Sequence, residues 1–467
     1  MKYFGLDYGT TNSLLYGYSD GHLYKTPRIP SAVVVSNGSV VKTGFDALDD
    51  RNRSGSLEKT PKRHIYNLDD YRANGVSCRK MISAILCELL RSGDFEQDSH
   101  ITLTVPNAYK SLQYSYMRDI LCTCLKEVFG ENHKMQIHLV PEPVAAALFY
   151  VHKHIQELPD VCRLVVCDIG GGTTDMCIVE VKKHNRALSF EIKDGMQHDE
   201  DLGGEKFEER ICQNMPIPNG LDEKEWNNTV QALKEGVSGE EEFPLLLQDG
   251  SEVCLSRMDF ISYIWDYLSE LEEMMSIMLK KSGMRPDNTW YILPVGGSCM
   301  IPAIRERLAK VFVGAHLTSE DEITIFDSVA QGAAIYSAWH DQALGTENYN
   351  DISIQHRTPH EIEICTANES WRCIVPQNAS DGPYPINVKL VDPIIKDGKY
   401  SLGMIKLQEG GRRSYEWPHD SMFDLAGRDI GGITLQLGIE IKECRPCKCW
   451  LKDSAVDGNY QEWIIKQ

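Results

Sequence analysis

The sequence of 467 residues contains no apolar run close to the ~18 residues that a membrane-spanning helix needs. Basic residues are in the minority, since 48 Lys and Arg stand against 68 Asp and Glu, and the formal net charge is −20. This balance argues against non-specific binding to nucleic acid or to an anionic membrane, so we expect neither as a partner. Residues 1–7 become charged too early for a secretory signal, and the 15 cysteines are scattered. We therefore expect reduced thiols and a cytoplasmic location.

Two common phosphate-binding signatures are also absent. No GxxxxGK[ST] loop occurs, and no complete GxGxxG opens a helix. The P-loop and dinucleotide-binding classes are therefore disfavoured.

A glycine-rich hairpin is the most distinctive feature that the sequence does have. The apolar run Val165–Ile169 contains Asp168, and it is followed by Gly170, Gly171, Gly172, Thr173, Thr174 and Asp175. Three consecutive glycines let the backbone approach a ligand closely, and the amides of such a turn can hold an anion. The flanking acids would repel a bare phosphate, and they make sense if Mg²⁺ sits between acid and phosphate. Glycine hairpins also occur for purely steric reasons.

The start of the chain repeats this plan. An apolar strand ends in Asp7, and Gly9, Thr10, Thr11 and Asn12 precede the apolar run 14–18. Two such hairpins predict two similar half-domains that present phosphate loops to a shared cleft. The alternative is two unrelated surface hairpins.

Four further segments follow in a fixed order over roughly the first 340 residues. They are VPEPVAAAL at 140–148, DLGGEKF at 201–207, VGGSCMIP at 295–302 and SVAQGAA at 328–334. Together with the hairpins they resemble the seventy-kilodalton heat-shock chaperones of the actin-like ATPase superfamily. The resemblance implies an α/β actin-like ATPase fold with two similar, ribonuclease-H-like lobes over residues 1–342, then a linker at 343–350. It further implies a smaller all-β domain at 351–467, a β-sandwich that binds unfolded or extended polypeptide, and co-chaperones as partners.

The same resemblance implies a site for ATP or ADP with Mg²⁺. The metal would be held, largely through water, by Asp7, Asp168 and Asp175. Lys62 and Thr173 would position the attacking water, with Glu142 near the metal-bound waters and Asp168 also catalytic. The nucleotide-binding residues would be Gly9, Thr10, Thr11, Asn12, Gly170, Gly171, Gly172, Thr173, Gly203, Gly204, Glu205, Lys234, Ser238, Gly296, Gly297 and Ser298. On the residues alone, Lys62 would more often be a solvated loop lysine, and Glu142 could equally be a partner of the helix dipole.

The adenosine pocket departs from the family pattern. Glu235 and Met300 stand where two arginines are expected, and Phe326 stands where an aspartate is expected. A carboxylate cannot supply the flat guanidinium face that stacks on adenine. We therefore expect weaker or less selective recognition of the base.

Apolar periodicity predicts the elements between these motifs. Helices are expected at 77–92, 111–129, 143–157, 203–215, 222–237, 257–281, 301–313 and 327–340. Strands are expected at 101–105, 136–140, 243–247, 252–255 and 291–295, short β segments at 31–45, and a loop at 46–75.

After residue 343 short alternating runs predict an all-β domain. The family's helical lid does not follow before Gln467, and its linker is altered at Asp351–Ile354, so we expect weak coupling between the domains. Cys444, Cys447 and Cys449 could supply most of a zinc site, although no second CxxC accompanies them.

Two functions remain open at this point. The first is an ATP-dependent chaperone with weak Mg²⁺-dependent ATPase activity. The second is a nucleotide-gated scaffold or an actin-like assembly protein with little hydrolysis. Sugar kinases share the hairpins, but the sequence shows no separate sugar pocket.

Overall fold

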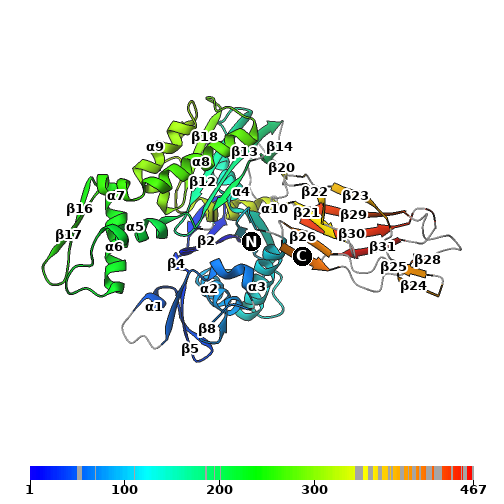
Figure 1. Cartoon of the computed structure of the whole chain (residues 1–467), viewed down its shortest axis with the longest axis horizontal. Helices are drawn as coiled ribbons and strands as arrows, with labels where there is room; N and C mark the ends of the chain where they lie inside the picture. The colour runs from blue at the N-terminus through cyan, green and yellow to red at the C-terminus, as the bar shows by residue number, and fades with distance from the viewer. Residues whose placement is uncertain are drawn as a thin grey trace. The chain divides into compact units, whose positions relative to one another are not determined.

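The computed structural model in Figure 1 forms two compact units, which are described separately. The first unit comprises Met1–Asn107 and Arg118–Ser353, and the second comprises Ala108–Met117 and Ile354–Gln467. The expected linker at 343–350 lies outside the described residues. The structure describes residues 1–49, 55–68, 70–109, 111–184, 187–193, 195–199, 201–341, 351–355, 361–365, 371–376, 379, 382–389, 394–397, 399–401, 406–409, 412–416, 423–424, 434–442, 445–453, 455 and 460–464.

The first sheet of the first unit has six strands. They are β1 (Tyr3–Tyr8), β2 (Asn12–Ser19), β3 (His22–Lys25), β4 (Ile29–Pro30), β10 (His100–Val105) and β11 (Gln136–Pro141). The order along the sheet is β11-β10-β1-β2-β3, with β4 beside β2. β1 and β2 form the antiparallel hairpin that the sequence predicts, and β10 runs parallel to β1.

The second sheet has seven strands and repeats this arrangement. They are β12 (Val161–Ile169), β13 (Thr174–His184), β14 (Ala187–Ile192), β15 (Gln197–Asp199), β18 (Trp290–Val295), β19 (His316–Leu317) and β20 (Asp351–Gln355). The order is β19-β18-β12-β13-β14-β20, with β15 beside β13. β12 and β13 form the second predicted hairpin, and β18 runs parallel to β12. In both sheets, therefore, an acid-flanked turn lies beside the carboxyl end of a parallel strand.

Most of the described helices match the predicted periodicity (Figure 1). They are α1 (Gly44–Leu48), α2 (Cys78–Ser92), α3 (Ser111–Phe129), α4 (Glu142–His154), α5 (Gly204–Asn214), α6 (Glu223–Gly239), α7 (Arg257–Tyr263), α8 (Trp265–Ser282), α9 (Pro302–Val311) and α10 (Ser328–His340). The single helix predicted at 257–281 is wrong, because Ile264 leaves the helical conformation (φ −104°, ψ 13°) and separates α7 from α8. The predicted strand pair beside α6 is present as the hairpin β16 (Glu242–Leu246) and β17 (Glu252–Ser256).

The loop predicted at 46–75 is also wrong. Its described residues include β7 (Ser56–Lys59), the 3₁₀ helix η1 (Pro61–Asn67) and β8 (Arg72–Ala73), and β9 (Val76–Ser77) follows. The short β segments expected at 31–45 are present as β5 (Ala32–Ser36) and β6 (Ser39–Thr43). β7 pairs with β5, whose Val33 and Val34 are fully buried. Pairing with this buried strand explains why the largely polar residues of β7 are extended. η1 follows directly, and it carries Lys62.

The crossing of α4 and α10 fixes the position of Glu142. A Cβ built on Gly332 of α10 would lie 1.7 Å from the carbonyl oxygen of Ala145, so only glycine allows this approach. A Cβ on Gly5 of β1 would likewise lie 2.2 Å from the carbonyl oxygen of Ala330. The first sheet, α10 and α4 are thus in direct backbone contact, which holds the start of α4 next to the strand ends.

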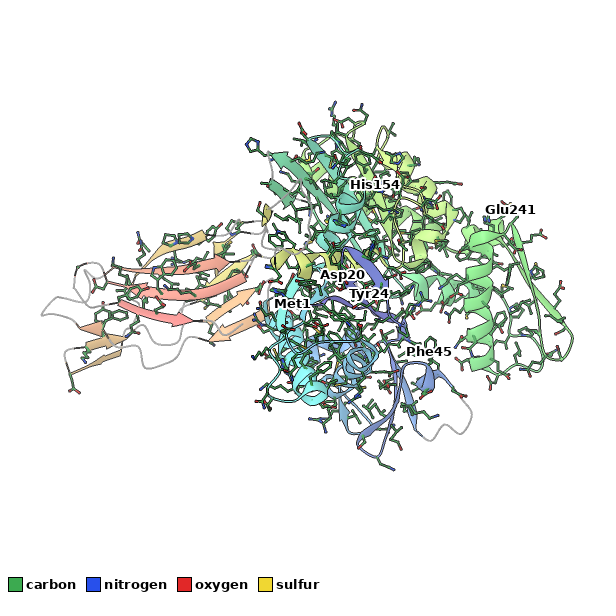
Figure 2. The ribbon with its side chains drawn as sticks, turned by 180° about the vertical axis from the view of Figure 1, so that it is seen from behind. Met1, Asp20, Tyr24, Phe45, His154 and Glu241 are labelled. Carbon is green, nitrogen blue, oxygen red and sulfur yellow. The ribbon has the colours of Figure 1, made fainter. Side chains whose placement is uncertain are left out.

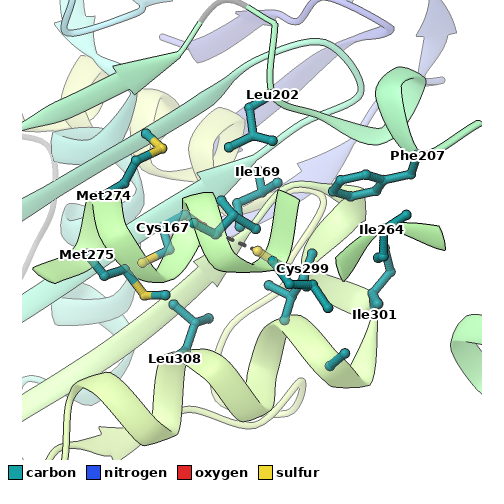
Figure 3. Packing of buried hydrophobic residues seen from close by; sticks show 14 of the residues in the cluster. Cys167, Ile169, Leu202, Phe207, Ile264, Met274, Met275, Cys299, Ile301 and Leu308 are labelled. Atoms are coloured by element: carbon teal, nitrogen blue, oxygen red, sulfur yellow. Dashed lines mark hydrogen bonds between the residues drawn. The ribbon is translucent and has the colours of Figure 1, made fainter. Parts of the chain in front are cut away.

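Behind the second hairpin lies an apolar core (Figure 3). Cys167 and Ile169 of β12 pack there with Phe207 of α5 and Met275 of α8. Cys299 donates its thiol to the carbonyl oxygen of Cys167 over 3.4 Å. Cys167 and Cys299 are both free thiols. This packing anchors β12, and with it the glycine turn that follows.

The outside of the first unit carries charged and some aromatic side chains (Figure 2). Phe45 of α1 is 63% exposed, and Glu241 pairs with Arg257. None of the helices in the described part of the chain is long and apolar enough to cross a membrane.

Every described element from residue 361 onward is a strand. They are β21 (Ile362–Cys365), β22 (Arg372–Val375), β23 (Gly382–Lys389), β24 (Ile394–Lys396), β25 (Lys399–Ser401), β26 (Lys406–Glu409), β27 (Arg412–Glu416), β28 (Phe423–Asp424), β29 (Thr434–Lys442), β30 (Arg445–Lys452) and β31 (Tyr460–Ile464). They form the sheets β22-β21-β26-β27, β23-β29-β30-β31 and β24-β25-β28. Cys449 is fully buried in their shared core, and Cys444 lies outside the described residues.

Candidate phosphate and metal site

The turns of the two hairpins meet. A Cβ built on Gly171 would lie 2.1 Å from Oγ1 of Thr11, and one on Gly172 would lie 3.0 Å from Cγ2 of Thr10. The turn after β1 is equally tight, because a Cβ on Gly9 would lie 2.2 Å from the carbonyl oxygen of Asn12. The glycines are therefore needed both within each turn and where the turns face each other. The structure brings together the two sets of residues that the sequence predicts for phosphate.

Lys62 and Glu142 form a buried ion pair beside these turns. Nζ of Lys62 lies 2.9 Å from Oε1 of Glu142, and their side chains are only 8% and 9% exposed. Nζ also lies 5.8 Å from the centroid of the Tyr8 ring, at the end of β1. Lys62 is thus no solvated loop lysine, and Glu142 at the start of α4 has a specific partner.

Four carboxyl groups interact electrostatically with the Lys62 ammonium group: Glu142, Asp7, Asp175 and Asp168. Burial alone would lower the pKa of Lys62, but Glu142 and Asp7 outweigh it and raise the pKa. Burial raises the pKa of Glu142 to about 7 despite Lys62, with Asp7 and Asp175 adding to the rise. Burial and the same neighbours raise the pKa of Asp168 well above its usual range. Ionising all of Asp7, Glu142, Asp168 and Asp175 against Lys62 alone would leave an excess of negative charge, which the raised pKa values reflect and which a bound cation would offset.

The donor set fits Mg²⁺ held mainly through water. Asp7 accepts a hydrogen bond from Thr104 over 2.9 Å, and Asp175 lies 2.9 Å from Nδ1 of His198. Within the described residues, no three His, Cys, Asp or Glu side chains converge as direct metal ligands. Mg²⁺ commonly binds through one or two carboxylates, several waters and substrate phosphates, which suits this arrangement.

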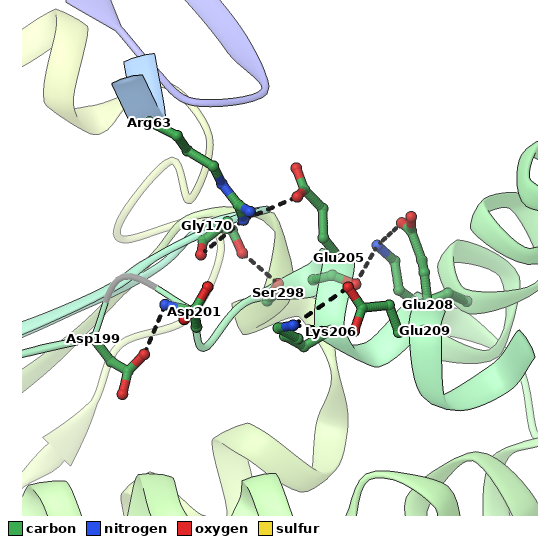
Figure 4. Close-up of polar contacts among 12 residues, drawn as sticks. Arg63, Gly170, Asp199, Asp201, Glu205, Lys206, Glu208, Glu209 and Ser298 are labelled. Carbon is green, nitrogen blue, oxygen red and sulfur yellow. Dashed lines mark hydrogen bonds and ion pairs between the residues drawn. The ribbon is translucent and has the colours of Figure 1, made fainter. Parts of the chain in front are cut away.

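Arg63 reaches across to the second turn, a contact that the sequence analysis did not anticipate. Its Nη2 donates to the carbonyl oxygen of Gly172 over 3.2 Å and pairs with Oε2 of Glu205 at 2.9 Å (Figure 4). Burial raises the pKa of Glu205, although Arg63 opposes that rise. Arg63 thereby ties η1 to both the second turn and the start of α5. The only sequence signal was its place next to Lys62.

The first residues of α5 form hydrogen bonds with the second turn. The amides of Gly204 and Glu205 donate to the carbonyl oxygens of Gly170 and Gly171 over 3.0 and 2.7 Å. These amides hold the turn in shape, so phosphate would have to use other donors. In the described part of the chain, no backbone carbonyl accepts from the amides of Gly171 or Gly172. Gly203 packs on the same turn, since a Cβ there would lie 2.8 Å from the carbonyl oxygen of Gly171.

The turn after β18 lies next to the turn after β12. Ser298 donates its hydroxyl to the carbonyl oxygen of Gly170 over 2.9 Å. Gly296 has φ +82° and a Cβ there would lie 2.5 Å from the carbonyl oxygen of Ile169, so this position requires glycine. The expected adenosine loop Gly296–Ser298 therefore continues the surface of the phosphate turn.

Two expected contacts from α6 have other partners. Lys234 pairs with Glu208 and donates to the carbonyl oxygen of Gly204 over 3.4 Å. Ser238 donates to the carbonyl oxygen of Lys234 within its own helix. A Cβ on Gly204 would lie 3.1 Å from both Nζ of Lys234 and Oγ of Ser298, which places Lys234 with the site and Ser238 one turn beyond it.

The three residues that depart from the family pattern in the adenosine pocket differ in their exposure and contacts. Glu235 is exposed and accepts a hydrogen bond from Gln231 over 3.0 Å. Met300 is partly buried and packs against the core. Phe326 is 46% exposed and lies against Gly297.

Comparison with known proteins agrees with this architecture. Residues 135–380, just over half of the chain, match the family model described as Hsp70 protein. The chain is also similar to a chaperone protein HscA homolog from Methylibium petroleiphilum, with 25% identity over 91% of this chain and 71% of that protein. The protein is therefore of the actin-like ATPase class. Within that class the chain belongs to the Hsp70 family, whose members are ATP-binding chaperones that act with Mg²⁺.

Proposed function

We propose that this protein is an ATP-dependent chaperone whose first unit binds MgATP between the two glycine turns and hydrolyses it slowly. The observation that carries the proposal is the buried Lys62–Glu142 pair beside two touching phosphate turns. A purely structural pair of hairpins would need neither this buried cation nor the carboxylates around it.

The chain's own residues would act by placement and by charge. The β- and γ-phosphates would lie on the free amides of Gly171 and Gly172 opposite Thr10 and Thr11. Mg²⁺, held through water by Asp7, Asp168 and Asp175, would supply positive charge at the phosphate oxygens. Phosphoryl transfer needs little covalent chemistry from the protein, so positioning and electrostatic stabilisation account for most of the rate.

Lys62 would act as an ammonium group and not as a base. Its raised pKa keeps it protonated at neutral pH, and Glu142 fixes its direction over 2.9 Å. A protonated amine can donate to the attacking water and to a phosphate oxygen, as Thr173 can through its hydroxyl. Glu142 would position Lys62 and the waters near the metal.

The second unit would bind unfolded or extended polypeptide. We place the ATPase domain at residues 1–342, the linker at 343–350 and the β domain at 351–467. In the two four-stranded sheets, β27 and β31 are edge strands among the described strands. An extended segment could add to such an edge through backbone hydrogen bonds, with side-chain pockets giving specificity. We further propose co-chaperones as partners and the cytoplasm as the location.

The test is turnover of ATP by the purified full chain with Mg²⁺, measured as phosphate release. Lys62→Ala should lower turnover by at least about 10²-fold, because it removes a positioned transition-state donor. Lys59→Ala is the matched control, since Lys59 is an exposed lysine just before η1. Turnover equal in the wild type and Lys62→Ala, with nucleotide still bound, would favour a nucleotide-gated scaffold instead.

A further inference from the structure

Phe326 is an exposed aromatic residue between buried neighbours. Its exposed fraction is 46%, whereas Ile325 and Asp327 are 3% and 6% exposed. A Cβ built on Gly297 would lie 3.1 Å from Cε1 of the ring. The ring therefore lies directly against the turn that follows β18.

The backbone that presents this ring is fixed from both sides. The carbonyl oxygen of Ile325 accepts from the amide of Gly296 over 3.0 Å. The carboxylate of Asp327 accepts from the hydroxyl of Tyr16 and from Nζ of Lys25, each over 2.7 Å. The backbone at Phe326 is therefore held in place although its side chain is exposed. A ligand that contacts the ring would lose little binding free energy to ordering this segment.

The sheet topology indicates where a nucleoside would extend from phosphates on the second turn. On one side of the hairpin, β15 pairs with β13 over Thr174–Met176 and covers that edge. On the other side β18 runs parallel to β12, with Asp168 opposite Val295, so their turns share one edge of the sheet. Ligands of open α/β sheets bind outside the carboxyl ends of the strands. A nucleoside would therefore cross the Gly296–Ser298 turn, beside Phe326.

Neither of the two residues that replace the expected arginines offers a flat face at this turn. Glu235 is exposed on α6 and paired with Gln231, and Met300 packs into the core. The guanidinium carbon of Arg28 lies 5.7 Å from the centroid of the Phe326 ring. Phe326 is 46% exposed beside Arg28, so area of its side chain is accessible to a planar ligand.

We propose that the ring of Phe326 is the surface on which the nucleobase stacks, and that it sets the base specificity of the site. This inference rests on the proposed function, since it takes the phosphates to lie between the two turns. Stacking on an aromatic side chain tolerates any base, because every base has a π face. The site therefore accepts adenine and guanine nucleotides with similar affinity, and the guanidinium of Arg28 strengthens the stack.

Calorimetric titration of the full chain with MgADP, MgGDP and the magnesium complex of ribose 5-diphosphate tests this inference. The third ligand carries sugar and phosphates without a base. Phe326→Ala should weaken MgADP and MgGDP by about tenfold each and leave ribose 5-diphosphate within about twofold of wild type. Phe326→Tyr should retain affinity, and Phe326→Leu should behave like Phe326→Ala because it keeps apolar area without a π face. Phe45→Ala, another exposed phenylalanine, is the matched control.

The outcomes distinguish the stacking role of Phe326 from the proposed phosphate site. MgADP affinity unchanged in Phe326→Ala, or an equal loss for ribose 5-diphosphate, overturns the stacking role while leaving the phosphate site intact. A wild-type preference for MgADP over MgGDP beyond about 10³-fold overturns the specificity role. A wild-type chain that binds none of the three ligands overturns the proposed function itself, and the stacking role with it.

Discussion

Removing Lys62 should destabilise the first unit in a way that depends on pH. The change is Lys62→Met, which keeps most of the side-chain volume and removes the ammonium group that interacts with Asp7, Glu142, Asp168 and Asp175. Breaking a buried ion pair by deleting one partner costs about 3–5 kcal/mol, because the remaining charge is left uncompensated. For a unit of this size that corresponds to roughly 4–7 °C in melting temperature.

The pH dependence follows from Glu142. Its pKa is raised in the folded protein from an ordinary value of 4.5 to about 7. Loss of Lys62 would raise this pKa further. Between the unfolded and the folded pKa the folded state binds the extra proton, so stability falls as pH rises through this window. The loss of unfolding free energy in Lys62→Met should therefore be larger at pH 8 than at pH 5.5.

The double variant Lys62→Met/Glu142→Gln separates this cause from simple loss of packing. It removes both charges, so its deficit at pH 8 should be only about 1–2 kcal/mol. Lys59→Met is the control for removing a lysine nearby. The assay is the first thermal unfolding transition of the full chain at both pH values. An equal deficit of Lys62→Met at pH 8 and pH 5.5, or additive effects in the double variant, would refute the reasoning.

Three further predictions concern turnover, release and the second unit. Asp168→Asn should lower Mg²⁺-dependent turnover by at least about 10²-fold in phosphate-release assays, since it weakens the carboxylate set around the metal; turnover within threefold of wild type would contradict the role of Asp168. Arg63→Ala should speed release of a fluorescent ADP analogue by about tenfold, because it removes the Arg63–Glu205 contact across the site; an unchanged off-rate in stopped flow would show that the contact is no barrier. Hydrophobic peptides should bind the full chain weakly and exchange rapidly in fluorescence anisotropy, because a segment added at an open sheet edge is held mainly by backbone hydrogen bonds; slow, ATP-dependent release would show the opposite.

Local sequence patterns predicted much of the first unit. Both hairpins carry their turn glycines and flanking acids within a few residues, so the pattern is readable without tertiary information. The break at Ile264 was not readable, because Phe260, Ile264 and Leu268 keep helical spacing across it. β7 was missed because its residues are polar and its pairing with β5 depends on contacts distant in sequence.

The candidate site was predictable in its parts and not in its pairings. Lys62 and Glu142 are 80 residues apart, and only the family resemblance named both. The contact of Arg63 with Gly172 requires two sheets to approach each other, and that of His198 with Asp175 requires β15 to pair with β13. Neither approach leaves a local signal, so sequence reasoning missed both residues.

The central claim is that nucleotide phosphates bind between the two glycine turns within reach of Lys62. A crystal structure of the full chain with MgADP and beryllium fluoride, a mimic of the γ-phosphate, tests it most directly. We expect the fluoride group to lie between Thr10–Thr11 and Gly171–Gly172, within hydrogen-bond distance of Nζ of Lys62. Nucleotide bound elsewhere, or bound at these turns with Lys62 still paired to Glu142 and out of reach of the fluoride group, would contradict it.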